Sequence, residues 1–163
     1  MENISTQVLF IALGILILIS AYFSGSETGM MSLNRYRLRH LEKEKHKGAK
    51  RVSKLLKRPD RLIGLILIGN NLVNIAAASI ATIIGIRFFG DVYGMLASTV
   101  VLTLVILIFA EVTPKTLAAL YPEKIAFPSS IILSLLLKLL FPLVIAVNWI
   151  TNGLLMLLGI SSE

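Results

Sequence analysis

Oxygen-bearing side chains interrupt three apolar stretches of this 163-residue chain. The first stretch carries "FSGSETGMMS" with Ser24, the second carries "GNNLVN" with Asn70 and Asn74, and the third carries "FAEVTP" with Glu111. Hydroxyl, amide and carboxylate oxygens are hard donors, which suit Mg²⁺, Ca²⁺ or Na⁺ better than zinc or copper. The chain has no cysteine, so thiolate metal chemistry is excluded. These residue types indicate a site for a hard cation.

The elements that must position these residues are membrane helices. Hydrophobic residues make up 56% of the chain and its mean hydropathy is +0.83, above the roughly 45–50% apolar content of soluble domains. Four apolar segments, at about 8–23, 62–89, 94–110 and 131–160, approach or exceed the ~20 residues that span a bilayer core. The first has no basic stretch before it, so we expect a retained helix rather than a signal peptide.

The net charge of +7 is concentrated in one segment. Residues 34–61 hold 12 of the 16 Lys and Arg residues, which by the positive-inside rule predicts a cytoplasmic loop, an external N-terminus and a cytoplasmic C-terminus. We expect a helical pair, broken around Lys47 and Gly48, close to anionic lipid headgroups. Nucleic acid is not expected as a partner, because topology alone accounts for the charge.

The predicted fold class is all-α and integral to the membrane, with three spanning helices in one domain over 1–163. The helices are expected at 5–33, 60–88 and 94–121, with a basic helical loop at 34–59. The fourth apolar segment, 129–160, contains Lys138 and Pro142 near its middle. Because a lysine in the bilayer centre is costly, we expect a bent juxtamembrane segment along the inner surface.

The polar clusters fall at one depth in this topology. Ser24 precedes Arg35 by about ten residues, which places it ~15 Å from the cytoplasmic end of its helix, and Asn70 lies about as far into the second helix. Glu111 reaches this level if the third helix continues to Tyr121; a shorter helix would bring it nearer the cytosol. A single carboxylate at this depth is a functional candidate, and it fits a transport site better than a permanent structural one.

Backbone irregularity is expected beside two of these residues. Pro114 removes a helical hydrogen bond and frees the carbonyl of Ala110, next to Glu111. Gly25 is expected to let the first helix bend and expose backbone oxygens near Ser24.

Simpler interpretations compete with a ligand set. Asn and Ser in membrane helices often only bond a neighbouring helix, at around 0.6 kcal/mol per pair, and "FSGSETGMMS" could be a kinked helix end. Neither explains a carboxylate. For Glu27 we favour an ion pair with Lys115 or Arg35, for Ala76 to Ser79 a packing or dimer face, and for His40 and His46 a solvated position.

Taken together, "FSGSETGMMSLNR", "GNNLVNI" and "FAEVTPKT", in this order on three successive helices, resemble the transmembrane domain of the CNNM (cyclin M) family and its bacterial CorB and CorC members. The likeness covers about residues 5 to 160. It implies a homodimeric Mg²⁺ transporter or exporter in a bacterial inner membrane, with Na⁺ as an expected exchange ion. Family members usually continue into a pair of ATP-binding CBS domains, which would follow this segment in a full-length chain.

The positions that match the family's ion site are Ser24, Asn70, Asn74 and Glu111, with Ser26, Gly69 and Asn71 left open as neighbouring choices. Because Mg²⁺ wants six oxygens at ~2.1 Å, backbone carbonyls near Gly25, Gly69 and Ala110 are expected to complete the coordination.

Two other function classes compete with a carrier. A Mg²⁺ sensor or accessory subunit would bind the ion and change conformation without conducting it. An intramembrane enzyme is not expected, since the sequence has no paired aspartates, no HExxH motif and no nucleophile beside a base.

Overall fold

The computed structural model describes residues 3–160, and every regular element in that range is a helix. The elements are α1 (Thr6–Met31), α2 (Arg35–Lys43), α3 (Lys47–Leu56), α4 (Pro59–Phe89), α5 (Asp91–Val105), the π-helical segment η1 (Ile106–Val112), α6 (Thr113–Leu120) and α7 (Pro122–Leu157). The predicted all-α class is confirmed. The helices expected at 5–33, 60–88 and 94–121 correspond to α1, α4 and the continuous run α5–η1–α6.

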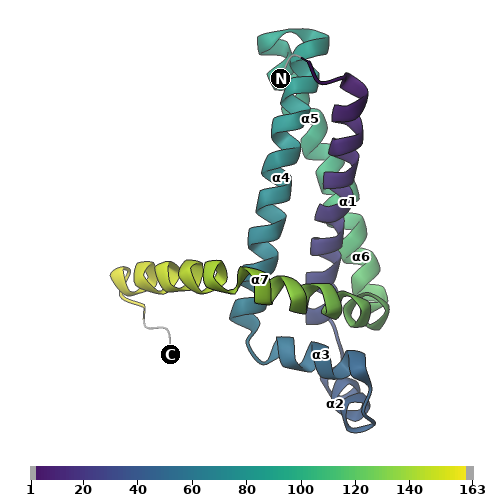
Figure 1. The fold of residues 1–163 in the computed structure, drawn as a ribbon, viewed down its shortest axis with the longest axis vertical. Coiled ribbons are helices and arrows are strands. Elements are labelled where there is room, and N and C mark those ends of the chain that lie inside the picture. The colour runs from purple at the N-terminus through teal and green to yellow at the C-terminus, as the bar shows by residue number, and fades with distance from the viewer. Residues whose placement is uncertain (1–2, 161–163) are drawn as a thin grey trace.

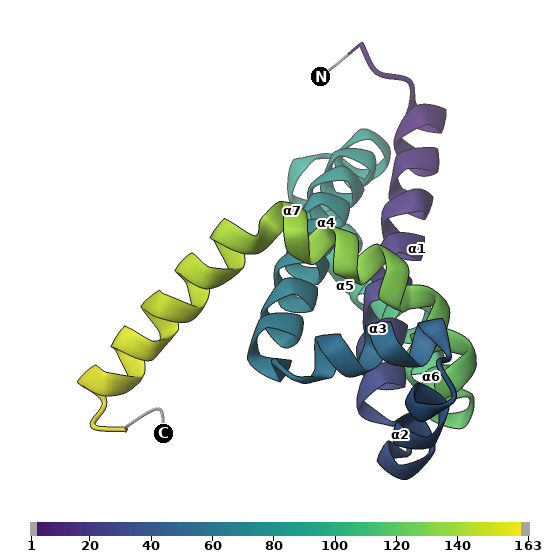
Figure 2. The ribbon, with the colours of Figure 1, turned by 60° about the horizontal axis from the view of Figure 1, so that its bottom comes forward.

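These three long helices run alongside one another, and α7 crosses them near one end (Figure 1). The short helices α2 and α3 lie beyond α7, at the end of the molecule opposite the N-terminus and the α4–α5 connection. Turning the molecule shows that the second half of α7 extends away from the bundle (Figure 2). The bundle therefore has one bare end and one end covered by charged short helices.

The helices begin and end where the local sequence favours it. Side chains of Ser5, Asn34 and His46 accept hydrogen bonds from backbone N–H groups in the first turns of α1, α2 and α3. Pro59 opens α4, where a missing N–H costs nothing. Gly90, with φ +82, separates α4 from α5 and adopts a backbone conformation that other residues rarely tolerate.

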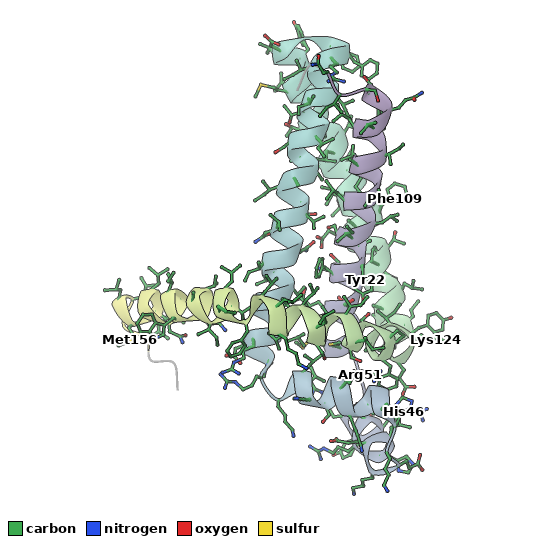
Figure 3. All side chains as sticks on the ribbon, viewed as in Figure 1. Tyr22, His46, Arg51, Phe109, Lys124 and Met156 are labelled. Carbon is green, nitrogen blue, oxygen red and sulfur yellow. The ribbon has the colours of Figure 1, made fainter. Side chains whose placement is uncertain are left out.

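The apolar core lies where α1, α3, α4 and α7 meet, at the end of the bundle covered by α7. Its most buried side chains come from all four helices: Met30, Val52, Leu62, Leu65, Ile66, Leu133 and Val144. Two polar contacts fasten the short helices to α7. Arg51, which is labelled in Figure 3, donates to the Ser130 hydroxyl at 3.0 Å, and Arg37 pairs with Glu123.

Most apolar side chains on the long helices face outward. Ile11, Leu72, Val100 and Phe109 are each at least half exposed, and Phe109 is among the side chains labelled in Figure 3. A soluble domain would bury such side chains, so their exposure fits a lipid surrounding. Four helices are long and apolar enough to cross a membrane: α1, α4, the run Asp91–Leu120, and α7. The chain is thus a multi-pass membrane protein by length and composition.

The helix that holds the fourth apolar segment differs from the predicted bounds of that segment. The helix α7 begins at Pro122 rather than at 129, and it stays helical through Pro128 and Pro142 to Leu157. Its direction changes partway along (Figure 2), in keeping with the effect of proline inside a helix. Length and composition leave it as a fourth candidate span, beyond the three predicted from the sequence.

The break in the basic loop lies slightly earlier than predicted. The chain turns at Glu44 to His46, where Lys45 has a positive φ of 64, and Lys47 and Gly48 already belong to α3. Both histidines are exposed, as predicted, and the Nδ1 of His46 also accepts the Ala49 N–H at 3.0 Å. The His46 ring also lies 4.9 Å from that of Phe127, so it joins α3 to α7.

A close backbone contact between α4 and α5 joins two glycines. A Cβ built on Gly94 would lie 2.5 Å from the carbonyl oxygen of Gly85, and a Cβ on Gly85 would lie equally near the oxygen of Gly94. This is the small-residue packing that brings membrane helices together. In the predicted packing run, Ala76 to Ser79, only Ala77 is fully buried.

Candidate cation site

The first group of oxygens joins α1 to α4. The Ser20 hydroxyl lies 2.8 Å from Oδ1 of Asn70 and 2.6 Å from Oδ1 of Asn74. Ser20 is fully buried, and the two asparagines are half-buried. Asn70 and Asn74 are one turn apart on α4, so both amides reach the same face of α1. Three uncharged oxygens thus gather inside the bundle.

The second group joins α1 to η1 one turn further along α1. The fully buried Ser24 hydroxyl lies 3.5 Å from Oε1 of Glu111, the long limit of a hydrogen bond. The other carboxylate oxygen, Oε2, lies 3.1 Å from Nζ of Lys115. Glu111 therefore presents one oxygen to α1 and the other to an ammonium on its own helix.

Close packing brings α1 against α4 beside the first group. A Cβ on Gly69 would lie 2.6 Å from Cζ of Phe23, so only glycine leaves room for that ring. Gly69 directly precedes Asn70, and Phe23 directly precedes Ser24. The ring thus fills the space between the two helices next to the polar side chains, and the backbone of α4 comes near α1.

The backbone around Glu111 is irregular, as its neighbourhood in the sequence predicts. Residues Ile106 to Val112 form a π-helix, in which the Thr113 N–H donates to the Ile108 carbonyl five residues back. Pro114 follows directly. A π-helical turn widens the helix and is frequent at functional sites, and here it contains Glu111 and the fully buried Ala110.

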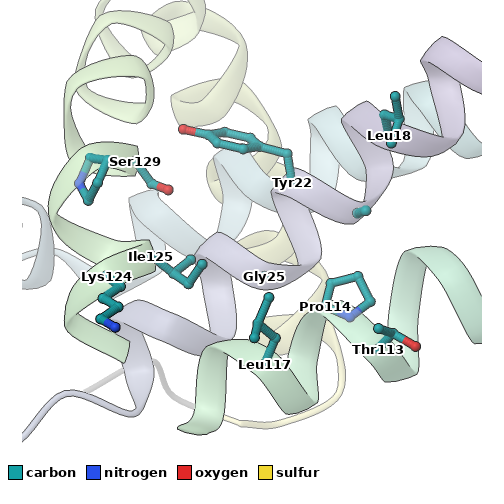
Figure 4. A pocket seen from close by; sticks show the side chains of 11 residues that line it. Leu18, Tyr22, Gly25, Thr113, Pro114, Leu117, Lys124, Ile125 and Ser129 are labelled. Carbon is teal, nitrogen blue, oxygen red and sulfur yellow. The ribbon is translucent and has the colours of Figure 1, made fainter. Parts of the chain in front are cut away.

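Gly25 lies within α1, beside Pro114 of α6. The helix α1 continues unbroken from Thr6 to Met31, so Gly25 does not end or open the helical hydrogen bonding. A Cβ on Gly25 would lie 3.6 Å from both Cβ and the carbonyl oxygen of Pro114, and Figure 4 shows the two residues side by side at a pocket of about 400 Å³. Gly25 thus packs against Pro114 at ordinary van der Waals distance, where α1 meets α6 next to Ser24.

The structure thus divides the predicted residues between two adjacent groups. Ser24 contacts Glu111, while Asn70 and Asn74 contact Ser20, a residue that the sequence reasoning missed. A signal existed, because Ser20 precedes Ser24 by four residues and shares its helix face. The two serines are separated by a rise of only ~6 Å along α1.

The expected ion pair of Glu27 is not formed. Lys115 pairs with Glu111, and Arg35 has no ion pair with Glu27 within residues 3–160. Lys115 and Glu111 are four apart on one helical run, so their contact needs no tertiary approach. Glu27 therefore takes no part in this charge pair.

The two groups share an open groove. Asn74 and Glu111 both line a groove of about 430 Å³ between α4 and the α5–η1 run, together with the hydroxyl-bearing Thr82, Thr99 and Thr103. No cluster of three or more His, Asp or Glu side chains occurs in the described part of the chain. A cation held here would meet mostly uncharged oxygens and one carboxylate, the hard-donor set expected from the sequence.

A bundle of outward-facing apolar helices with a buried oxygen cluster defines an integral membrane domain. The family model of the cyclin M (CNNM) transmembrane N-terminal domain matches residues 10–163, and the chain belongs to that family. The family resemblance inferred from the three motifs is confirmed.

Similar proteins occur in bacteria and plants. The chain is 60% identical over all of its 163 residues to the UPF0053 inner membrane protein YfjD of Escherichia coli (strain K12), covering 38% of that protein. It is 52% identical to a UPF0053 protein of Haemophilus influenzae, covering 39% of it. It is 34% identical over 152 residues to a chloroplastic DUF21 domain-containing protein of Arabidopsis thaliana, covering 93% of this chain and 23% of that one. The chain spans less than two fifths of the length of these relatives.

Proposed function

We propose that this chain is the transmembrane domain of a Mg²⁺ carrier. Ser24, Asn70, Asn74 and Glu111 replace part of the hydration shell of the ion within the membrane. The observation that carries the proposal is the contact between Ser24 and Glu111, one turn of α1 from the contacts of Asn70 and Asn74. Hard oxygens with one carboxylate bind Mg²⁺ without holding it permanently.

The remaining ligands come from water or the backbone. Mg²⁺ demands near-octahedral coordination and gives up water reluctantly. The groove that Asn74 and Glu111 line is the proposed route by which water reaches the site. Backbone carbonyls near Gly25, Gly69 and Ala110 stay in the proposal as further oxygens, and the π-helical segment around Ala110 favours the third of these.

The proposed topology has three spans and an external N-terminus. The helices α1, α4 and α5–η1–α6 cross the membrane, and the basic helices α2 and α3 lie on the cytoplasmic side near anionic headgroups. The helix α7 runs across this same end of the bundle (Figure 1), which suits a juxtamembrane helix along the inner surface. In bacteria this membrane is the inner membrane, in keeping with the name of the Escherichia coli relative.

The proposal also covers the oligomeric state of the protein and the ion that drives Mg²⁺ transport. None of residues 145–160 is buried, although most are apolar, so the second half of α7 needs lipid or a second copy to cover it. A homodimer supplies such a copy. Na⁺ is proposed as the coupling ion, and CBS domains of the full-length protein as the cytoplasmic partner.

The test is Glu111→Gln in the full-length protein, purified and reconstituted into vesicles. The loss of the single carboxylate should abolish Mg²⁺ binding by calorimetry and Mg²⁺ flux by an enclosed indicator dye. Glu27→Gln is the matched control, since Glu27 makes no ion pair with Lys115 or Arg35 and should keep both activities. Unchanged flux in Glu111→Gln would refute the carrier assignment.

The same vesicles separate a carrier from a sensor. A sensor binds Mg²⁺ and changes conformation without moving it. Wild-type protein that binds Mg²⁺ but carries none, under Mg²⁺ and Na⁺ gradients of either direction, would establish the sensor and reject the carrier.

A further inference from the structure

Ser20 differs from most hydroxyl residues of α4 and α5 in where its side chain points. The hydroxyls of Ser79, Thr82, Thr99 and Thr103 each donate to the backbone carbonyl four residues earlier on their own helix, at 2.6 to 3.0 Å. This is the usual way for a membrane helix to satisfy a hydroxyl. The contacts of Ser20 instead cross to α4, although the residue is fully buried.

Protons are too few for the contacts that Ser20 makes. A serine hydroxyl carries one proton, and an amide oxygen can only accept. The Ser20 oxygen lies within 2.8 Å of two amide oxygens, Oδ1 of Asn70 and Oδ1 of Asn74, and can donate to one of them. The remaining oxygen pair has no proton between its members.

Two arrangements remove this conflict. One amide can turn over, so that its NH₂ group donates to Ser20, since amide oxygen and nitrogen exchange places without changing shape. Alternatively, the three oxygens can share a cation. Neighbouring ligands of an octahedral Mg²⁺, each at ~2.1 Å, lie about 3.0 Å apart, close to the separations in this group.

The position of Ser20 favours the shared cation. Its partners, Asn70 and Asn74, are the two amides of the candidate site, and Ser24, the next residue on the same face of α1, contacts Glu111. A single hydrogen bond from Ser20 to one amide would be enough to join α1 to α4, whereas the Ser20 oxygen lies close to both amides. Ser20, one turn N-terminal to Ser24 on α1, therefore belongs to the same oxygen cluster.

We infer that Ser20 supplies a further oxygen to the cation site, alongside Asn70 and Asn74. The inference rests on the proposed function and deepens it by extending the site one turn of α1 toward the N-terminus. The added ligand is uncharged. It therefore contributes coordination geometry and selectivity for hard divalent cations, while Glu111 contributes the charge.

The experiment replaces the hard ligand with a soft one. The natural chain has no cysteine, so Ser20→Cys introduces a single thiol into this domain. Thiolates prefer soft metals such as Cd²⁺ over Mg²⁺. We expect Mg²⁺ affinity, measured by calorimetry on the full-length protein, to fall at least tenfold and a Cd²⁺ affinity absent from the wild type to appear. Ser79→Cys is the matched control, because the Ser79 hydroxyl is bonded to its own helix.

A second variant guards against misfolding. Ser20→Thr keeps the hydroxyl and should keep Mg²⁺ affinity within about threefold, whereas Ser20→Ala should lose it as Ser20→Cys does. Equal loss in Ser20→Thr and Ser20→Ala would overturn the inference, because the hydroxyl would then not be the group that matters. Retained Mg²⁺ affinity in Ser20→Ala, with no new Cd²⁺ binding in Ser20→Cys, would also overturn it and favour the turned amide.

The outcomes also separate this inference from the proposed function. Wild-type protein that binds no Mg²⁺, together with Cd²⁺ binding in Ser20→Cys but not in Ser79→Cys, would reject the Mg²⁺ carrier and keep Ser20 as a ligand position. Wild-type Mg²⁺ binding that is lost in Glu111→Gln and unchanged in Ser20→Ala would keep the Mg²⁺ site of the carrier and reject Ser20 as a ligand.

Discussion

Glu111 is approached by two different groups, and this decides how its charge can be used. One carboxylate oxygen lies near the Ser24 hydroxyl, and the other lies 3.1 Å from the Lys115 ammonium. A cation that binds at Glu111 must share the carboxylate with Lys115 or move the ammonium aside. Lys115 has a half-exposed side chain, so water and headgroups can receive it when it moves.

Removing the ammonium should therefore strengthen cation binding. Lys115→Met should raise Mg²⁺ affinity several-fold, since exposed ion pairs are worth roughly 0.2–1 kcal/mol, while Lys115→Arg should stay near wild type. Calorimetric titration of the full-length protein measures the effect. Weaker Mg²⁺ binding in Lys115→Met would mean that Lys115 orients the carboxylate more than it competes for it.

The helix contacts depend on glycines at a few close approaches. The contact between Gly85 and Gly94 brings the backbones of α4 and α5 together at the end of the bundle away from the cation site. The approach of Phe23 to Gly69 and of Pro114 to Gly25 brings α4 and α6 to α1 beside it. A Cβ on Gly85, Gly94 or Gly69 would clash with its neighbour, whereas a Cβ on Gly25 would make an ordinary contact with Pro114.

A side chain at the first of these contacts should separate the two helices. Gly94→Leu places a Cβ 2.5 Å from the Gly85 oxygen, and overpacking of this kind costs about 1–3 kcal/mol or more. The full-length protein in detergent should unfold at a clearly lower temperature. Gly14→Leu is the matched control, because nothing lies within 4 Å of a Cβ there. Equal melting temperatures for both variants would contradict the close approach of Gly85 and Gly94.

The direction of α7 relative to the other long helices bears on which helices cross the membrane. Four helices are long and apolar enough, but α7 runs across the other three rather than alongside them (Figures 1 and 2). With three spans, the basic helices and the end of α7 lie on one side of the membrane. With four spans, they lie on opposite sides.

Single cysteines in this naturally cysteine-free domain distinguish these topologies. Lys54→Cys in α3 and Met156→Cys in α7 should react with a membrane-impermeant maleimide only from the cytoplasmic side, and Tyr93→Cys only from the external side. All three native side chains are exposed. Labelling of Met156→Cys from the external side would make α7 a fourth span.

The amino-acid sequence by itself determined the helical membrane class, the ends of most helices and the chemical type of the site. Apolar runs of this length can satisfy their backbone in a bilayer only as helices, and hard oxygens at similar depths on three helices predicted a meeting of Ser24 with Glu111. Only the packing of the helices decided that Ser20 contacts Asn70 and Asn74, and that Gly25 packs on Pro114. The physical reason is that periodicity fixes which residues share a face of one helix, while the rotation and spacing of neighbouring helices come from side-chain packing between them.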